Sequence, residues 1–223
     1  MIPLRDDIKA RRWPFVTVLF IVANCAVFVY EISLGSGLRD FIRAFGFTPV
    51  LLTSGDTFPR AALTLFTSMF IHANFWHIAG NMLFLWVFGD NVEDVFGHIG
   101  FVCFYAVSGV GGSLLHVLVS SGSSIPSVGA SGAISGVMGA YLLLYPKARI
   151  LALIPFGFFL RATYVPALFF LGFWFVLQLL YGLAFWRGGA GIAYFAHIGG
   201  FAAGLLMALP FKFSRRRVFS LRG

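Results

Sequence analysis

The residues with the clearest chemical potential are a serine, two histidines and an asparagine, each near the start of an apolar segment. Ser131 begins one such segment, His197 lies near the start of the last, and His77 and Asn81 lie four residues apart in an earlier one. A serine hydroxyl is a poor nucleophile until a base takes its proton, and a neutral histidine can be that base and later protonate the leaving amine. The set indicates acyl-transfer chemistry, with Ser131 as nucleophile and His197 as base.

The oxyanion formed in such a reaction needs hydrogen-bond donors. The amide of Asn81, the ring N–H of His77 and the backbone N–H of Ser131 are candidates, and residues four apart share one face of a helix. No Asp or Glu lies at a matching depth to orient His197, so a Ser–His dyad is predicted. Structural roles stay open: Ser131 suits a helix N-cap, and the other three suit hydrogen bonds between helices.

The sequence lacks the residues that two other classes of intramembrane protease require. A zinc protease would need His-Glu-x-x-His on a helix, but no Glu separates His72 from His77. An aspartyl mechanism needs carboxylates on two helices, whereas Asp90, Glu93 and Asp94 cluster at one helix end. We therefore expect neither metal nor other cofactor. The remaining histidines are His72, for which an interfacial role is expected, His116, expected to be structural, and His98, expected far from the site.

Composition indicates a membrane protein. The 223 residues are 59% hydrophobic and only 11% charged, with a mean hydropathy of +0.90, whereas soluble domains carry about 25% charged residues. The net charge of +8 gathers before the first apolar segment and after the last. Basic clusters that flank membrane spans set orientation and contact anionic lipids. We therefore expect lipid contacts at the termini and no nucleic-acid partner.

Six segments are expected to span the bilayer as helices in an all-α bundle, between a basic N-terminus (1–12) and a basic tail (212–223). A span needs about 20 apolar residues, and the chain between these termini (13–211) forms one catalytic unit. Twelve of the 16 Lys and Arg residues lie on one side if both termini are inside, which predicts an N-in, C-in orientation. The predicted spans are 13–34, 75–92, 99–120, 131–146, 162–186 and 190–211.

The connections carry further signals. The long first loop (35–74) contains Leu38, Phe41, Ile42 and Phe45 at helical spacing, which predicts an amphipathic helix at the outer interface. The fourth span is short, so the loop before Ser131 must dip into the bundle.

Glycine spacing predicts which spans meet. Gly132 and Gly136 in the fourth span, like Gly200 and Gly204 in the sixth, are four residues apart. Such small-residue faces allow close helix contact, which would bring Ser131 and His197 together.

These motifs resemble the rhomboid family of intramembrane serine proteases over about residues 13–211. The resemblance rests on Gly129-Ala130-Ser131-Gly132, on Ala196-His197-Ile198-Gly199-Gly200 and on His77-Ile78-Ala79-Gly80-Asn81, in that family's order on six spans. It implies Ser131 as nucleophile, His197 as general base, and an oxyanion hole from His77, Asn81 and the Gly129 loop. It also implies single-span membrane protein substrates, cut near the outer membrane boundary at small residues that are followed by helix-destabilising ones.

Two positions depart from the family pattern. A Trp-Arg pair often found in the first long loop is replaced by Leu63-Thr64, and an aromatic residue that stacks on the histidine in some members is replaced by Ser135. The packing that orients His197 must therefore come from elsewhere or be looser.

Three functions compete. An active protease is favoured because the dyad is intact; a catalytically silent member would bind membrane clients without cutting them; a transporter would require an inverted repeat, which the sequence lacks. The expected location is the bacterial plasma membrane, with the active site open to the outer side.

Overall fold

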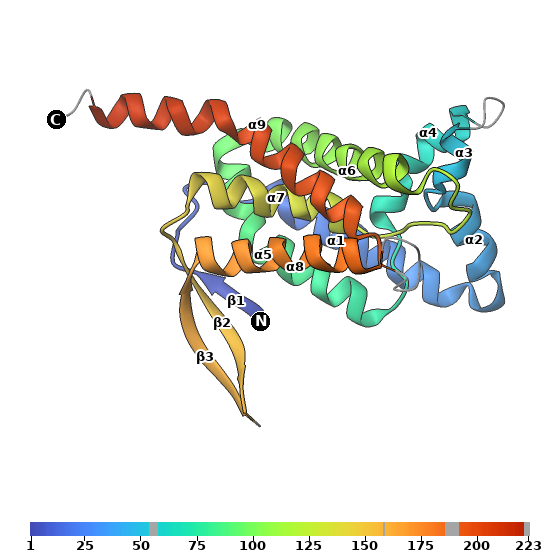
Figure 1. The fold of residues 1–223 in the computed structure, drawn as a ribbon, viewed down its shortest axis with the longest axis horizontal. Helices are drawn as coiled ribbons and strands as arrows, with labels where there is room; N and C mark the ends of the chain where they lie inside the picture. The colour runs from blue at the N-terminus through green and yellow to red at the C-terminus, as the bar shows by residue number, and fades with distance from the viewer. Residues whose placement is uncertain (54–57, 158, 186–191, 221–223) are drawn as a thin grey trace.

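The computed structural model describes residues 1–53, 58–157, 159–185 and 192–220, and most of them are helical (Figure 1). Within these described ranges, four helices are long and apolar enough to cross a membrane: α1, α6, α8 and α9 up to Lys212. In chain order the elements are β1 (Ile2–Asp6), α1 (Phe15–Ser33), η1 (Gly35–Gly37), α2 (Leu38–Phe45), α3 (Pro49–Thr53), α4 (Phe58–Thr67), η3 (Ser68–Phe70), α5 (Phe75–Phe96), α6 (His98–Ser120), α7 (Ser131–Leu144), β2 (Arg149–Phe156), β3 (Phe159–Pro166), α8 (Ala167–Ala184) and α9 (Tyr194–Ser220).

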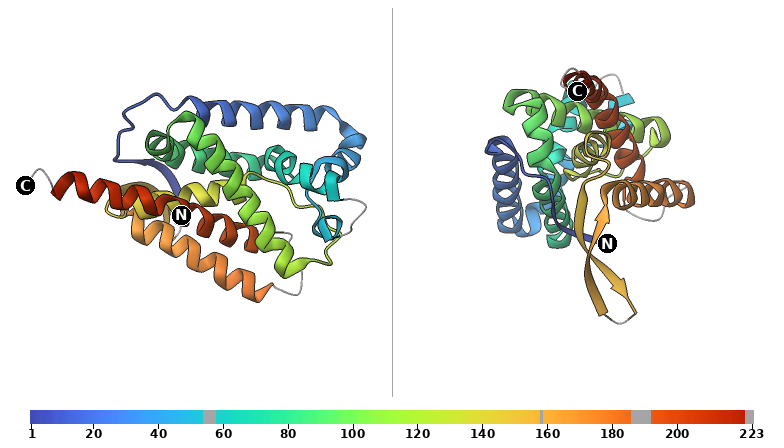
Figure 2. Two further views of the ribbon diagram at one scale, coloured as in Figure 1. Left: turned by 90° about the horizontal axis from the view of Figure 1, so that it is seen from above. Right: turned by 90° about the vertical axis from the view of Figure 1, so that its left-hand side faces the viewer.

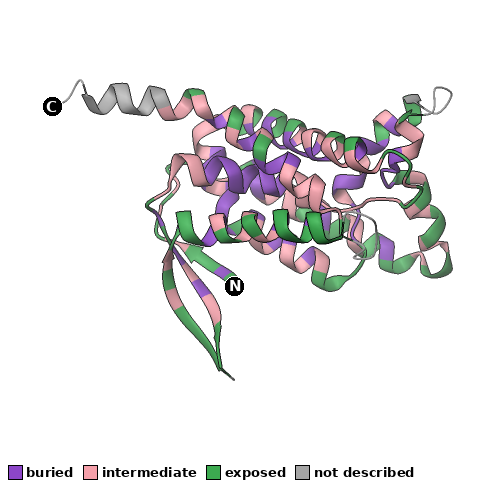
Figure 3. Cartoon of the chain, in the orientation of Figure 1, coloured by how far each residue is buried: buried purple, intermediate pink, exposed green. Residues whose placement is uncertain are grey.

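Helix α7 is the centre of the bundle. Its 14 residues include nine consecutive buried ones, from Ala133 to Tyr141, and the buried class concentrates there (Figure 3). The other long helices surround it when the bundle is seen end-on (Figure 2). At 1.5 Å per residue α7 is only about 21 Å long, so its first residue lies inside the bundle rather than at its end.

A three-stranded antiparallel sheet, in the order β1-β2-β3, lies at the end of the bundle where α7 ends. The prediction of an all-α chain missed this sheet, and residues 162–166 belong to β3 instead of the fifth span. Hydropathy does not separate apolar strands from apolar helices. The local signals are Gly157, which turns the hairpin at φ +60°, and Pro166, directly after which α8 begins.

The first loop is largely helical, and α2 covers the segment whose spacing is amphipathic. The loop before Ser131 is hydrogen-bonded to this first loop, because Phe47 and Ser127 exchange backbone hydrogen bonds of 3.0 and 2.7 Å. Two residues further on, the Gly129 N–H donates to the Ser68 carbonyl over 2.9 Å. These backbone bonds fix the path of the chain into α7.

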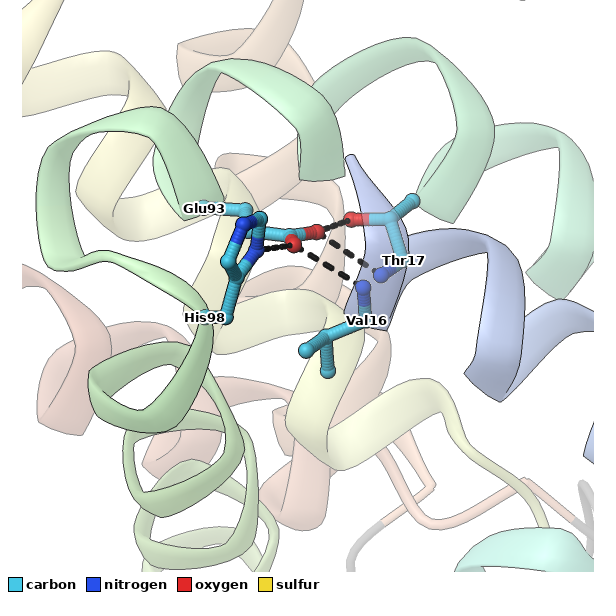
Figure 4. A network of polar contacts seen from close by, with 4 residues as sticks. All are labelled: Val16, Thr17, Glu93 and His98. Atoms are coloured by element: carbon cyan, nitrogen blue, oxygen red, sulfur yellow. Dashed lines mark hydrogen bonds and ion pairs between the residues drawn. The ribbon is translucent and has the colours of Figure 1, made fainter. Parts of the chain in front are cut away.

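Two buried carboxylates fasten α1. Glu93 of α5 accepts hydrogen bonds from the Val16 N–H (2.9 Å) and from the Thr17 N–H and hydroxyl (2.8 and 2.7 Å), and it contacts His98 (Figure 4). It thereby satisfies first-turn N–H groups that a helix leaves free. At the other end of α1, Glu31 accepts from the backbone N–H just before α5. Polar bonds therefore hold both ends of α1 against the α5 region.

Candidate active site

The first turn of α7 and the first turns of α9 bring two predicted side chains into contact. The Oγ atom of Ser131 lies 2.8 Å from Nε2 of His197. Both residues are half-buried, Ser131 as the first residue of α7 and His197 as the fourth of α9. With the proton on Nδ1, Nε2 is free to accept the serine proton, which is the arrangement that general-base activation requires.

The second ring nitrogen of His197 is hydrogen-bonded to a side chain of α8. Nδ1 of His197 lies 2.8 Å from Oε1 of Gln178, a buried side chain. The Nδ1–H donates to this amide oxygen, and that bond selects the tautomer in which Nε2 is an acceptor. Trp174, one turn earlier on α8, lies with its ring centroid 6.0 Å from that of the imidazole, and Tyr194 approaches it edge-on at 6.4 Å.

Sequence reasoning missed Gln178. A signal was available, because Gln178 is the one non-aromatic polar side chain between Ala167 and Ala184. A polar side chain in an apolar span usually faces the bundle interior and a partner there. The neutral amide takes the orienting place that an aspartate has in a triad.

The predicted oxyanion residues gather beside the dyad. Gly129 has φ +124°, a conformation that favours glycine. A Cβ atom there would lie 2.7 Å from the His77 ring and 3.6 Å from Nδ2 of Asn81. The Gly129 backbone, the imidazole and the amide thus meet at one point, where donors could converge on a developing negative charge.

One cavity of about 770 Å³ connects these groups; among its lining residues are Ser131, His197, His77, Asn81 and Gly129. Its size is that of ordinary ligand sites, which range over about 300–1,000 Å³. His116, expected to be structural, also lines it. Within the described residues, no three His, Cys, Asp or Glu side chains lie close enough together to hold a metal ion.

Glycines set the distance between α7 and α9. A Cβ atom at Gly200 would collide with the carbonyl of Gly132, and one at Gly204 with the carbonyl of Gly136. Both glycine faces predicted from spacing therefore lie against each other. Without side chains between them the two backbones touch, and this contact carries Ser131 and His197 into hydrogen-bond range.

Comparison with known proteins identifies the family. The family model described as "Rhomboid domain" matches residues 59–212, more than half of the chain. The chain belongs to the rhomboid family. With its apolar helices, this rhomboid is an integral membrane protein.

Three relatives illustrate the range of similarity. The rhomboid protease GluP of Bacillus subtilis is 31% identical over 94% of this chain and 37% of its own length. The mitochondrial rhomboid protein 1 of Saccharomyces cerevisiae is 32% identical over 52% of this chain and 34% of its own, and RHOMBOID-like protein 1 of Arabidopsis thaliana is 29% identical over 89% and 54%. The chain thus spans about a third to a half of the length of these relatives.

The two departures from the rhomboid pattern have local consequences. The Ser135 hydroxyl donates to the Ser131 carbonyl over 2.6 Å and leaves the orientation of His197 to α8. At the position of the Trp-Arg pair, Leu63 is exposed, while the buried Thr64 donates to the carbonyl of Ala61. Neither residue of this pair lines the cavity.

The expectation that His72 is interfacial was wrong, because this side chain is buried with only 1% exposed. Its Nε2 lies 2.9 Å from Nδ2 of Asn81, and the Glu31 carboxylate accepts its backbone N–H. In this rhomboid His72 therefore accepts from the Asn81 amide and fixes its orientation beside the cavity. Helical spacing did not predict the contact between His72 and Asn81, because His72 lies before α5 rather than in it.

Replacing Gln178 with leucine is expected to lower kcat about 10- to 100-fold, the usual effect of losing an orienting hydrogen bond, with little change in KM. The leucine keeps the volume but removes the acceptor that holds His197. Gln178→Glu, which keeps an acceptor, should recover much of the rate. Steady-state kinetics and thermal denaturation of the purified variants separate positioning from stability.

The matched control is Leu180→Ala, on the same helix and 56% exposed, which should behave as wild type. Wild-type kcat in Gln178→Leu would exclude the positioning role.

Proposed function

We propose that this rhomboid is an intramembrane serine endopeptidase that cleaves transmembrane segments of single-span proteins through an acyl-enzyme. The observation that carries the proposal is the 2.8 Å contact between Ser131 Oγ and His197 Nε2 at the wall of a cavity. A half-buried polar pair in a lipid-embedded bundle is energetically costly, and such pairs often mark functional sites. The likeness to the Bacillus subtilis protease supports the reading.

The proposed reaction assigns a role to each of these side chains. His197 accepts the hydroxyl proton as Ser131 attacks the scissile carbonyl, and a tetrahedral oxyanion forms beside Asn81 and His77. Gln178 accepts from Nδ1 and supports the imidazolium. The imidazolium then protonates the leaving amine, and the C–N bond breaks. A water molecule next gives a proton to His197 and attacks the acyl carbonyl; the bond from this carbon to Ser131 Oγ breaks, the imidazolium returns the proton to Oγ, and the second product leaves.

The proposed membrane arrangement has six spans, with α5 and the short α7 beside the four helices that meet the length and hydropathy criteria. Both termini lie inside, next to anionic lipids, and the cavity opens to the outer side. Cleavage then occurs near the outer boundary of the substrate segment. A bacterial plasma membrane fits the Bacillus subtilis relative, which is matched over 94% of this chain, while other relatives are named mitochondrial or chloroplastic.

A serine-directed probe tests the nucleophile separately from the substrate. The purified chain is treated with a fluorophosphonate, and peptide mass mapping should place the adduct on Ser131, because its hydroxyl lies 2.8 Å from Nε2 of His197, the general base of the proposed mechanism. In parallel, a tagged single-span reporter is incubated with the chain in liposomes and should yield two fragments. Capture of the intact reporter without an adduct or fragments would support the silent, client-binding alternative and contradict the proposal.

A further inference from the structure

The hairpin β2–β3 lies at the end of the bundle remote from the dyad. Ser131 begins α7, and the hairpin follows the other end of that helix. Figure 1 and the end-on view of Figure 2 agree that the hairpin runs across the helix axes and projects sideways past the bundle. Because spanning helices run along the bilayer normal, a hairpin with this direction lies along the membrane surface.

The tip of the hairpin is apolar on both faces. The register pairs Phe156 with Phe159 and Pro155 with Leu160, and directly opposed residues share a face. Phe156, Phe159 and Leu160 are 70%, 79% and 61% exposed. A hairpin in water keeps at least one polar face, so this tip requires an apolar environment that the described chain does not provide.

The basic residues that flank the tip indicate which apolar environment it enters. Arg161 lies opposite Ile154, which is the next pair along the face that carries Phe156 and Phe159. Arg149 is the first residue of β2, and its side chain is exposed. The carboxylates nearest to the hairpin belong to Asp6 and Asp7 beside the start of β2, where Asp7 accepts the backbone N–H of Arg149 over 2.8 Å. No described carboxylate is within salt-bridge distance of either arginine. Aromatic side chains beside unpaired arginines are typical of the membrane interface, where the rings lie at headgroup level and the cations bind anionic lipids.

The apolar surface is also continuous with the lipid-facing side of the bundle. Tyr164 of β3, then Leu168 and Phe169 in the first turn of α8, are exposed apolar or amphipathic side chains. The base of the same hairpin packs inward, because Ile150 and Ala152 are fully buried in the core. The hairpin is therefore anchored at its base to the bundle while its tip extends from the lipid-exposed start of α8.

We propose that the β2–β3 tip docks into the inner leaflet, with Phe156, Phe159 and Leu160 in the interface and with Arg149 and Arg161 binding anionic headgroups. The leaflet follows from the proposed N-in orientation, and the inference does not depend on proteolysis. The hairpin joins α7 to α8, so this docking would fix the inner ends of the helices that carry Ser131 and Gln178.

A depth measurement tests the docking. In the chain with Cys25→Ala and Cys103→Ala, an environment-sensitive fluorophore is attached at Phe159→Cys and, as the control on the same side, at the exposed Lys147→Cys. In vesicles of phosphatidylcholine and phosphatidylglycerol, the label at position 159 should emit at shorter wavelength than the label at position 147 and should be quenched more by lipids brominated on their acyl chains. Emission and quenching equal to those at position 147 would overturn the proposal.

Two variant pairs separate insertion from charge. Phe156→Ser with Leu160→Ser should shift the 159 label toward the aqueous emission, with thermal denaturation checking the fold. Arg149→Gln with Arg161→Gln should abolish the gain in quenching on adding phosphatidylglycerol, whereas Arg39→Gln with Arg43→Gln on α2 should keep it. Quenching independent of phosphatidylglycerol in the parent would overturn the headgroup contact. A shift of the label at position 159 to shorter emission wavelength that appears only when membrane proteins are added would indicate that the tip binds a protein partner, and it would overturn lipid docking.

Discussion

Replacing Ser131 with alanine is expected to lower the rate of reporter cleavage by at least about 10³-fold, as removal of a catalytic nucleophile does in serine proteases. The alanine lacks the oxygen that lies 2.8 Å from His197, and no other described side chain is hydrogen-bonded to Nε2. Thermal denaturation should change little, because the hydroxyl makes no other hydrogen bond in the described structure. Reporter cleavage in liposomes, followed over time, measures the loss.

Ser135→Ala is the matched control. Ser135 lies one turn further along α7, and its hydroxyl donates to a backbone carbonyl, a bond that contributes little to helix stability, so most activity should remain. His197→Ala should be as inactive as Ser131→Ala. The double variant should be no worse than either single one, because residues that act as a unit are non-additive. Cleavage that persists in Ser131→Ala would contradict the proposed mechanism.

Gly204→Ala is expected to reduce both activity and stability, although it adds only one methyl group far from the dyad. The new Cβ would overlap the backbone of Gly136, which cannot rotate away, so α9 must move off α7. Overpacking of this kind costs roughly 1–3 kcal/mol. A displacement of about 1 Å between catalytic groups lowers rates by about 10²-fold, and His197 lies two turns earlier on the same helix. Melting temperature and kcat measure the two effects.

Gly172→Ala adds the same methyl group to α8, where a Cβ would meet nothing within 4 Å. This control should keep full activity and gain slightly in stability, because alanine is a better helix former than glycine by about 0.5–1 kcal/mol. Equal behaviour of the two variants would show that the α7–α9 backbone contact does not position the dyad.

Much of the candidate site was predictable from sequence because few residues can be polar inside a membrane. Ser131, His197, His77 and Asn81 are exceptions to hydropathy, and the glycine spacing indicated which helices meet. The depth of each residue follows from counting along its span. The structure lines one cavity with all four side chains, whereas their catalytic roles stay predictions.

The rest depended on tertiary contacts that a linear pattern does not record. The sheet was hidden because hydropathy does not separate apolar strands from apolar helices, and because β1, which pairs with β2, is far from it in the sequence. Gln178 contacts the site through His197, across the α8–α9 interface, and His72 contacts it through Asn81 of the helix that follows. Such indirect roles require knowledge of which faces pack together.

The placement of His197 on α9 has a consequence for biogenesis. Ser131 enters the membrane on α7, but the base that activates it lies on the last helix that the structure describes. A ribosome-bound chain that has inserted only as far as α8 therefore holds a serine without a base, and such a hydroxyl is unreactive. Under the proposed mechanism, proteolytic competence would arise only when α9 joins the bundle, so an incomplete chain in the translocon would not endanger the membrane proteins being inserted beside it.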